Sequence, residues 1–366
     1  MHVVLLTLLS FVHEPGGLAS TREPASVTGG AAALPCAWPS TIAVQTSGGL
    51  CTGTLIHPQV VVYAAHCGDA VTHLRVGDHA DVAARELDIE ACQVNPDYLG
   101  VTSQAQDWAY CTLATPVDDL PLTPAAYGCE LDAIAAGTEV VIAGFGQDAA
   151  GMGAGPKRWA LTHIVSSFGA TANIGGDGAS TCPGDSGGSA MLRLADGSWR
   201  AISMVSTGVD CGSAAVHVLM RAAIPWIESS SGIDVTPCHD VDGGWNPGPA
   251  CAGFYAGDGS EDASWSDACA DVPRSAASQS CGPAAPDPGD GTSSSGEGGD
   301  ELGTSADADP TATGSSGPGD AGSSGDATGA TAPAAHGCAI DRHDATAALP
   351  WVVLVAARRR RRPANR

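Results

Sequence analysis

The sequence has few basic residues for its length. Its 366 residues include 16 Lys and Arg against 40 Asp and Glu, which gives a formal net charge of −24. Proteins that bind nucleic acid need a basic surface for the phosphates, so this balance argues against such a partner. Long stretches of helical periodicity and Cys-x-x-Cys pairs are also missing. Their absence argues against a helical protein and a zinc ribbon, and no pattern indicates a metal or another cofactor.

Cysteine, in contrast, is abundant. Thirteen cysteines are typical of proteins from an oxidising compartment. The apolar stretch Val3–Val12 has the length of a signal-peptide core rather than of a membrane span, and Gly17–Ala19 offers a small-residue cleavage site. The start lacks Lys and Arg, which leaves a buried strand as the alternative. We expect a signal peptide over residues 1–19 and a secreted or cell-surface protein.

Short apolar runs alternate with Gly, Pro and Asp turns between residues 27 and 232. Examples are the segments 60–63, 139–143 and 201–205, which are rich in Val, Ile and Ala. Many short strands separated by turns predict an all-β domain.

Three segments carry the chemistry of an activated serine. Residues 182–188 read CPGDSGG, and glycines around Ser186 let the backbone approach a substrate closely. An apolar strand ends at His66 beside a cysteine, and Asp107 precedes another apolar strand. A serine hydroxyl becomes a nucleophile when a base removes its proton and a carboxylate orients that base. Ser186, His66 and Asp107 are therefore the candidates for these roles.

At these motifs the chain resembles the chymotrypsin/trypsin family of serine proteases, from about Val27 to Ile227. The resemblance implies two antiparallel six-stranded β-barrels with a short C-terminal helix, and protein or peptide substrates cut in the cleft between the barrels. It implies His66 as base, Asp107 as its orienting carboxylate and Ser186 as nucleophile. The backbone N–H groups of Gly184 and Ser186 would form the oxyanion hole. A catalytically silent relative that binds peptides is the alternative.

The resemblance also implies the specificity pocket and the activation step. The pocket residues would be Ser180, Ser206, Gly208 and Ala215. Ser180 on the pocket floor is uncharged, so we expect cleavage after apolar residues. The segment from Val27 resembles a mature N-terminus, whose freed amine would pair with Asp185. Residues 20–26 are then a propeptide, removed by a cut after Ser26.

Four disulfides are expected in the protease region. The resemblance pairs Cys51 with Cys67 and Cys182 with Cys211. Cys92 and Cys111 lie on expected neighbouring strands that flank Asp107, which favours a third bridge. Cys36 and Cys129 remain as the fourth pair.

The composition changes beyond residue 232. Residues 233–282 contain four cysteines and few apolar residues, which indicates a disulfide-linked extension or a small module. A module that binds substrate or cell wall is the alternative, and an adhesin would have its function here. Residues 283–337 are rich in Gly, Ser, Ala and acidic side chains and are expected to be a disordered linker.

The last segment, residues 338–366, combines Cys338, an apolar run over 345–357 and five arginines over 358–362. An apolar run followed by arginines is typical of a segment halted in a membrane, although this run is shorter than a full span. The segment resembles the C-terminal sorting tails of myxobacterial surface proteins, which are cut near the cysteine by a sorting protease. We therefore expect a possible membrane anchor, and a basic tail that binds nucleic acid or an anionic surface is the alternative.

Overall fold

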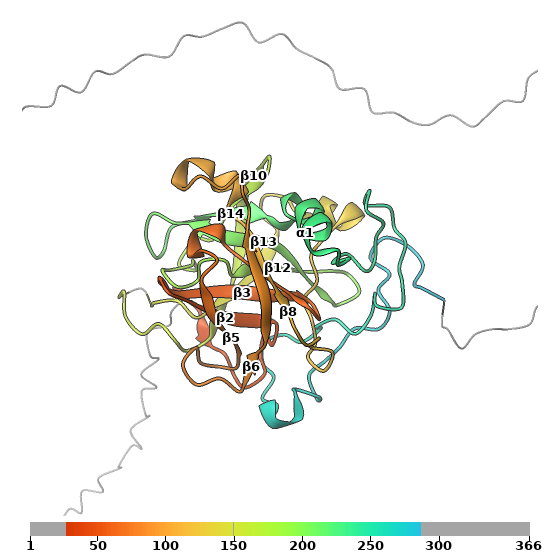
Figure 1. Ribbon diagram of the computed structural model, residues 1–366, viewed down its shortest axis with the longest axis horizontal. Helices are drawn as coiled ribbons and strands as arrows, with labels where there is room; N and C mark the ends of the chain where they lie inside the picture. Colours follow the sequence, from red (N-terminus) through yellow and green to blue (C-terminus); the bar gives the residue numbers. More distant parts are fainter. Residues whose placement is uncertain (1–26, 149, 287–366) are drawn as a thin grey trace, which may run out of the picture. The chain divides into compact units, whose positions relative to one another are not determined.

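The computed structural model describes residues 27–148 and 150–286 (Figure 1). The expected signal peptide, the propeptide, most of the linker and the tail with Cys338 lie outside the described residues. The protease region and the extension after it belong to one compact unit.

The first barrel is a seven-stranded antiparallel sheet in the order β6-β5-β2-β3-β4-β8-β7. Because β6 and β7 are separated by Asp88 alone, one extended segment pairs with β5 at one end and with β8 at the other. The sheet therefore closes on itself. Its strands are β2 (Thr41–Thr46), β3 (Gly49–His57), β4 (Val60–Tyr63), β5 (Val71–Val76), β6 (Arg85–Leu87), β7 (Ile89–Val94) and β8 (Ala109–Leu113).

The second barrel is a seven-stranded sheet in the order β1-β10-β11-β14-β13-β12-β9. Its strand β9 also pairs with β10, so six strands form a closed ring to which the two-residue β1 is added. The strands are β1 (Ala31–Ala32), β9 (Glu139–Gly144), β10 (Arg158–Phe168), β11 (Thr171–Ile174), β12 (Ser189–Arg193), β13 (Trp199–Thr207) and β14 (Ala215–Leu219).

The expected all-β class with two barrels is confirmed. Each barrel sheet has seven strands, whereas six were expected. In the first barrel the closing strand is interrupted, and in the second β1 is an addition outside the ring. The short helix α1 (Ile224–Ser231) follows the second barrel, with Pro225 in its first turn and Gly232 at φ 72° after its end. Proline and glycine at these positions are typical helix boundaries.

The apolar patterns explain the strands. Along β10, Ala160, Thr162 and Ile164 are buried, whereas Leu161 and Val165, which follow Ala160 and Ile164, are exposed. This alternation has the two-residue period of a strand with one face in a core. Strand β4 is buried at every position because it lies inside the sheet between β3 and β8.

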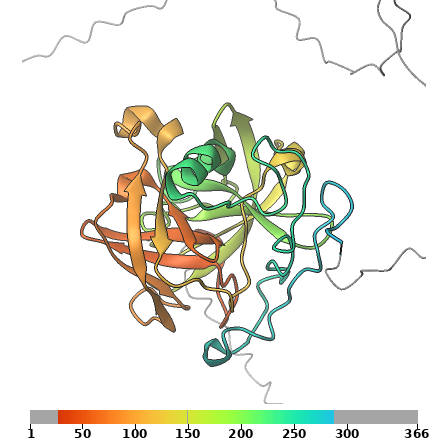
Figure 2. The ribbon, with the colours of Figure 1, turned by 45° about the vertical axis from the view of Figure 1, so that its right-hand side comes forward.

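Residues 233–286, which we call the extension, contain little regular structure beyond the 3₁₀ helix Trp265–Asp267. Figures 1 and 2 show the extension, in blue-green, as an irregular chain beside the strands. Its apolar residues Tyr255 and Val272 are buried in one cluster with Trp38, which precedes β2 of the first barrel, and Trp199 of the second barrel. The main apolar side chains of the extension therefore complete the core of the barrels, and a small cluster around Cys238, Cys251 and Phe254 accompanies them.

The expected bridge between Cys36 and Cys129 is wrong. Cys36 is bonded to Cys269 and Cys129 to Cys281, so both protease cysteines pair with the extension. The expectation failed because it treated the extension as a separate unit, whereas the extension packs on both barrels. The other expected bridges are present, and Cys238–Cys251 is internal to the extension.

The helices in the described part of the chain are short. None of them combines the length and the hydrophobicity that crossing a membrane requires.

Candidate active site

Strand pairing in the first barrel brings His66 and Asp107 together. Tyr63, the last residue of β4, pairs with Ala109, the first residue of β8. Because the strands are antiparallel, the chain that follows β4 lies opposite the chain that precedes β8. His66 lies in the former, in the 3₁₀ helix Ala65–Cys67, and Asp107 lies in the latter. His66 Nδ1 is 2.8 Å from Asp107 Oδ2.

The carboxylate of Asp107 is buried and held from three directions. In addition to the imidazole, the backbone N–H of His66 donates to Oδ1 at 2.9 Å, and the Ser206 hydroxyl donates to Oδ2 at 2.5 Å. Asp107 is 1% exposed, whereas the His66 side chain is 29% exposed. One end of the imidazole is therefore fixed by a buried acceptor, and the ring remains accessible from solvent.

The loop that carries Ser186 rests against the first barrel. Thr52 of β3 contacts it twice, because its N–H donates to Ser186 O at 2.9 Å and its hydroxyl donates to Gly184 O at 2.9 Å. Gly187 has φ +84°, and a Cβ at this position would lie 2.5 Å from Ala64 N and from Thr52 O. Only glycine fits this approach without backbone movement. The loop is therefore packed directly against the segment that leads to His66.

Two backbone N–H groups of this loop have no partner. In residues 27–148 and 150–286, neither Gly184 N–H nor Ser186 N–H donates a hydrogen bond. Gly184 has φ +99°, a conformation that favours glycine. The Ser186 hydroxyl likewise has no hydrogen bond within these ranges. Hydrogen bonds between catalytic groups often form fully only when substrate binds.

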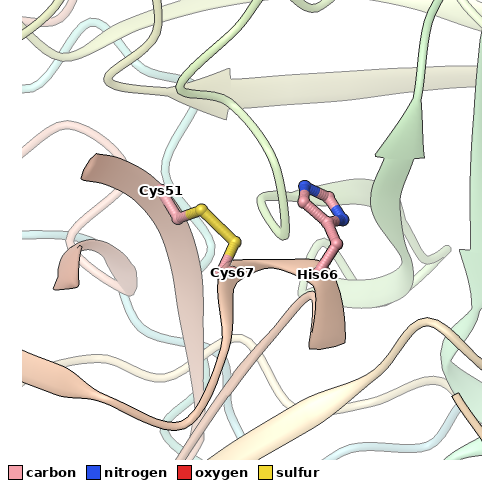
Figure 3. A group of neighbouring side chains, drawn as sticks. All are labelled: Cys51, His66 and Cys67. Carbon is pink, nitrogen blue, oxygen red and sulfur yellow. A yellow bond between two sulfur atoms is a disulfide. The ribbon is translucent and has the colours of Figure 1, made fainter. Parts of the chain in front are cut away.

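A disulfide fixes the turn that holds His66. Figure 3 shows His66 and Cys67 projecting from the same turn, with Cys67 joined to Cys51 of β3. His66 Nδ1 or Nε2 and the two sulfurs lie within 4.8 Å of one another. Sulfur atoms in a disulfide are not thiolates, which are the form that binds metals. We therefore interpret this group as a structural link beside the imidazole.

A cavity of about 290 Å³ opens beside Ser186. It is lined by Thr181, Cys182, Pro183, Ser186 and the continuous segment 205–211. The expected pocket residues Ser206 and Gly208 are among these. Ser180 and Ala215 are buried and do not line the cavity, and the Ser180 hydroxyl donates to Ser213 O.

Asp185 precedes Ser186 in the same loop, and its side chain is buried. Its carboxylate accepts hydrogen bonds from Gly146 N–H at 2.8 Å and from Cys182 N–H at 2.9 Å. Burial raises the pKa of Asp185 to about 6, although these two hydrogen bonds lower it. The expected partner, Val27, is buried in the second barrel and is linked to Ser26 by a peptide bond. An uncut chain has no free amine at Val27, so the expected ion pair is not formed.

The sequence also matches a known protein family over the region that contains this site. A family model described as Trypsin matches residues 27–227. The chain belongs to the trypsin family. The matched residues include both barrels, His66, Asp107, Ser186 and the cavity, and they make up a trypsin-like serine protease domain. The match ends inside α1, so the whole extension lies outside the trypsin-family region.

The chain is also similar to individual curated proteins. Vitamin K-dependent protein C from Mus musculus and that from Rattus norvegicus are each 29% identical over 215 residues. These matches cover 50% of this chain and 46% of each relative. The chain therefore spans about half the length of the curated relatives it matches.

Two residues at this trypsin-family site, Thr52 and Asp210, were not predicted from the sequence. Thr52 holds the Ser186 loop, and its position next to Cys51 was the available signal. Asp210 lines the cavity, yet the expected pocket was described without it. Its place between Gly208 and Cys211, which are both in recognised motifs, could have identified it.

Proposed function

We propose that this protein is an active serine endopeptidase that cuts protein or peptide substrates. The observation that carries the proposal is the contact of 2.8 Å between His66 Nδ1 and a buried Asp107, next to a Ser186 that lines a cavity. Trypsin-family membership supports the same reaction class.

In the proposed mechanism, His66 removes the proton of Ser186 as the hydroxyl attacks the substrate carbonyl. The imidazolium then donates this proton to the leaving amine, and water hydrolyses the acyl-enzyme. Asp107 holds the imidazole in the tautomer that presents Nε2 as a base and stabilises the imidazolium. Its three hydrogen-bond donors keep the carboxylate in place.

The unpartnered N–H groups of Gly184 and Ser186 are the proposed oxyanion hole. They belong to the loop that carries the nucleophile. Thr52 holds this loop through hydrogen bonds to the carbonyl oxygens of Gly184 and Ser186. A donor of this kind contributes about 2.7–4 kcal/mol to transition-state stabilisation.

We propose cleavage after apolar residues. Apart from Asp210, the residues that line the cavity are apolar, glycine, hydroxyl-bearing or joined in a disulfide, and Ala215 lies next to the lining residue Gly208. A side chain that fills a cavity with this lining is stabilised mainly by burial of its apolar surface, at about 25 cal/mol per Å². A cleavage profile on a peptide library checks this preference, and a profile dominated by Lys and Arg before the cut would contradict it.

Activation is proposed to follow a cut between Ser26 and Val27. The new amine would add a positive charge next to Asp185, a buried carboxylate whose pKa stays raised by burial although the charge of Arg158 lowers it. Sequencing of the N-terminus of the active enzyme tests this, since another start would contradict it.

The proposed location is outside the cell or on its surface. Six disulfides in the described residues support an oxidising compartment. Export by residues 1–19 and processing near Cys338 remain predictions on segments outside the described residues.

An organophosphonate probe tests the central proposal. It should label the activated protein, and the Ser186→Ala variant should be unlabelled and cleave no peptide. Absence of labelling in correctly cut protein would favour a silent peptide-binding relative. An adhesin function of the extension is less well supported, because Tyr255 and Val272 are buried against the barrels.

A further inference from the structure

The cavity beside Ser186 contains one ionisable side chain, that of Asp210. The other lining residues are apolar, glycine, hydroxyl-bearing or joined in the disulfide Cys182–Cys211. An uncharged pocket was expected from Ser180, which is buried and does not line the cavity. The carboxylate at the cavity is thus supplied by Asp210, the residue before Cys211.

Asp210 is held in a fixed place. The segment 208–211 is limited on one side by the end of β13 at Thr207 and on the other by the Cys182–Cys211 bridge. The Asp210 Oδ1 accepts a hydrogen bond from Ser213 N–H at 3.1 Å. Thr207 itself is tied to the first barrel, because its hydroxyl accepts from Gln104 Nε2 at 3.0 Å. The carboxylate therefore has a defined position at the cavity.

The charge of Asp210 is not balanced locally. No Lys or Arg lines this cavity, and Asp210 is in none of the ion pairs of the described residues. The neighbouring Val209 is 91% exposed, so the segment stands at the mouth of the cavity rather than inside the barrel. A cationic group that arrives with a substrate would meet an unpaired carboxylate there.

Strand pairing indicates where the substrate chain runs. The last residue of β13 opposite β12 is Met204, which pairs with Ser189. Val205 then exchanges backbone hydrogen bonds with Gly187 and Gly188, and the following residues 206–208 border the cavity with no described strand paired to them on this side. A peptide can add to such a free edge in extended form. The side chain before the scissile bond then fills the cavity while its carbonyl reaches Ser186.

Successive side chains of an extended peptide point to opposite sides, and this alternation determines which substrate residue lies near Asp210. Side chains two positions apart point to the same side and are separated by about 7 Å. The residue two positions before the one that fills the cavity thus points to the same side as the cavity, near its mouth.

We propose that Asp210 is a specificity-determining residue that selects substrates with Lys or Arg two positions before the residue at the scissile bond. This assignment rests on the proposed endopeptidase function. It is compatible with an apolar residue in the cavity, because the carboxylate acts at the mouth. An exposed ion pair of this kind predicts a two- to fivefold preference in kcat/KM.

The test uses fluorogenic peptides with one apolar residue fixed before the cut and Lys, Gln or Glu two positions earlier. Activated full-length protein should cleave the Lys peptide about two- to fivefold faster than the Gln peptide and the Glu peptide slowest. Asp210→Asn should equalise the Lys and Gln peptides, and Asp210→Lys should favour Glu. The matched control Asp81→Asn, which removes an exposed carboxylate that does not line the cavity, should keep the preference. High salt should reduce the preference, since it screens exposed charges.

The outcomes separate the two proposals. If the activated protein cleaves no peptide, the endopeptidase proposal fails and the Asp210 assignment falls with it. If it cleaves all three equally, or if Asp210→Asn retains the Lys preference, the Asp210 assignment is overturned while the proposed function stands. A charge preference that arises only at the residue next to the scissile bond also overturns it.

Discussion

The bridge Cys129–Cys281 should stabilise the protein more than the bridge Cys238–Cys251. The first joins the connection between the barrels to the extension, and its cysteines are separated by 152 residues. The second closes a segment of 13 residues within the extension. The perturbation is the replacement of either pair by serines in a Ser186→Ala background, which prevents self-digestion.

The magnitude follows from the chain path that each bridge closes. With the other bridges intact, Cys129 and Cys281 are connected by a path of roughly seventy residues, for which the chain-entropy model gives about 4.4 kcal/mol. The same model gives about 3 kcal/mol for the short Cys238–Cys251 segment. The first variant also loosens the bond of 2.7 Å from the Ser280 hydroxyl to the buried Glu130.

Thermal unfolding measures the difference. At about 2–4 °C per kcal/mol, the loss of Cys129–Cys281 should lower Tm by roughly 10–20 °C and the loss of Cys238–Cys251 by roughly 6–12 °C. Peptide mapping without reduction must first confirm that the remaining bridges are unchanged. An equal or larger effect of the internal bridge would contradict this expectation, because it would mean that the extension contributes little to holding the barrels.

Three further variants test the site and the core. In the uncut chain the pKa of Asp185 is raised to about 6 from 3.8, so its contribution to stability is present below pH 3.8 and lost as pH rises through 6. Urea unfolding should show on the order of 3 kcal/mol more loss between pH 4 and 7 for the uncut protein than for Asp185→Asn, and parallel curves would contradict this. Gly187→Ala should abolish peptide cleavage because its Cβ meets Ala64 N and Thr52 O, whereas Gly169→Ala, also at positive φ but with open space, should retain it. Glu130→Gln, which breaks a buried ion pair of 3.0 Å with Arg200, should cost about 3–5 kcal/mol in urea unfolding, and a change below 1 kcal/mol would show that the pair is dispensable.

The sequence was sufficient for the features that depend on local patterns. The expected strands over 60–63, 139–143 and 201–205 all lie within strands of the structure, because short Val- and Ile-rich runs between turn residues favour this conformation. His66 and Asp107 were placed together by motif, and the register Tyr63–Ala109 gives the physical reason.

The cavity and two of the bridges depend on packing between distant segments, which local patterns do not encode. Ser180 is buried and donates to Ser213 O instead of lining the cavity, whereas Asp210 does line it. Cys36 pairs with a cysteine 233 residues away, and no spacing rule selects such a partner. Elimination within the protease region therefore led to the wrong pair.

Tyr255 of the extension is part of the buried core of the protease region. Tyr255 is fully buried, and its backbone N–H donates to Leu122 O at 2.8 Å while its carbonyl accepts from Trp199 N–H at 3.0 Å. It therefore connects the segment between the barrels with a strand of the second barrel. A chain that ends at Gly232 would lose these bonds and expose the apolar faces of Trp38 and Trp199.

We expect a chain of residues 27–232 to aggregate or remain unfolded, whereas residues 27–286 should fold, both in the Ser186→Ala background. Removal of a buried aromatic side chain alone costs about 3–5 kcal/mol, a large part of the stability of a typical domain. Size-exclusion chromatography and thermal unfolding compare the two chains. A monomeric 27–232 chain with an unchanged Tm would show that the trypsin-family region is independent of the extension. In the expected case, the folded protease ends at the extension rather than at α1, because the extension supplies part of the core of both barrels.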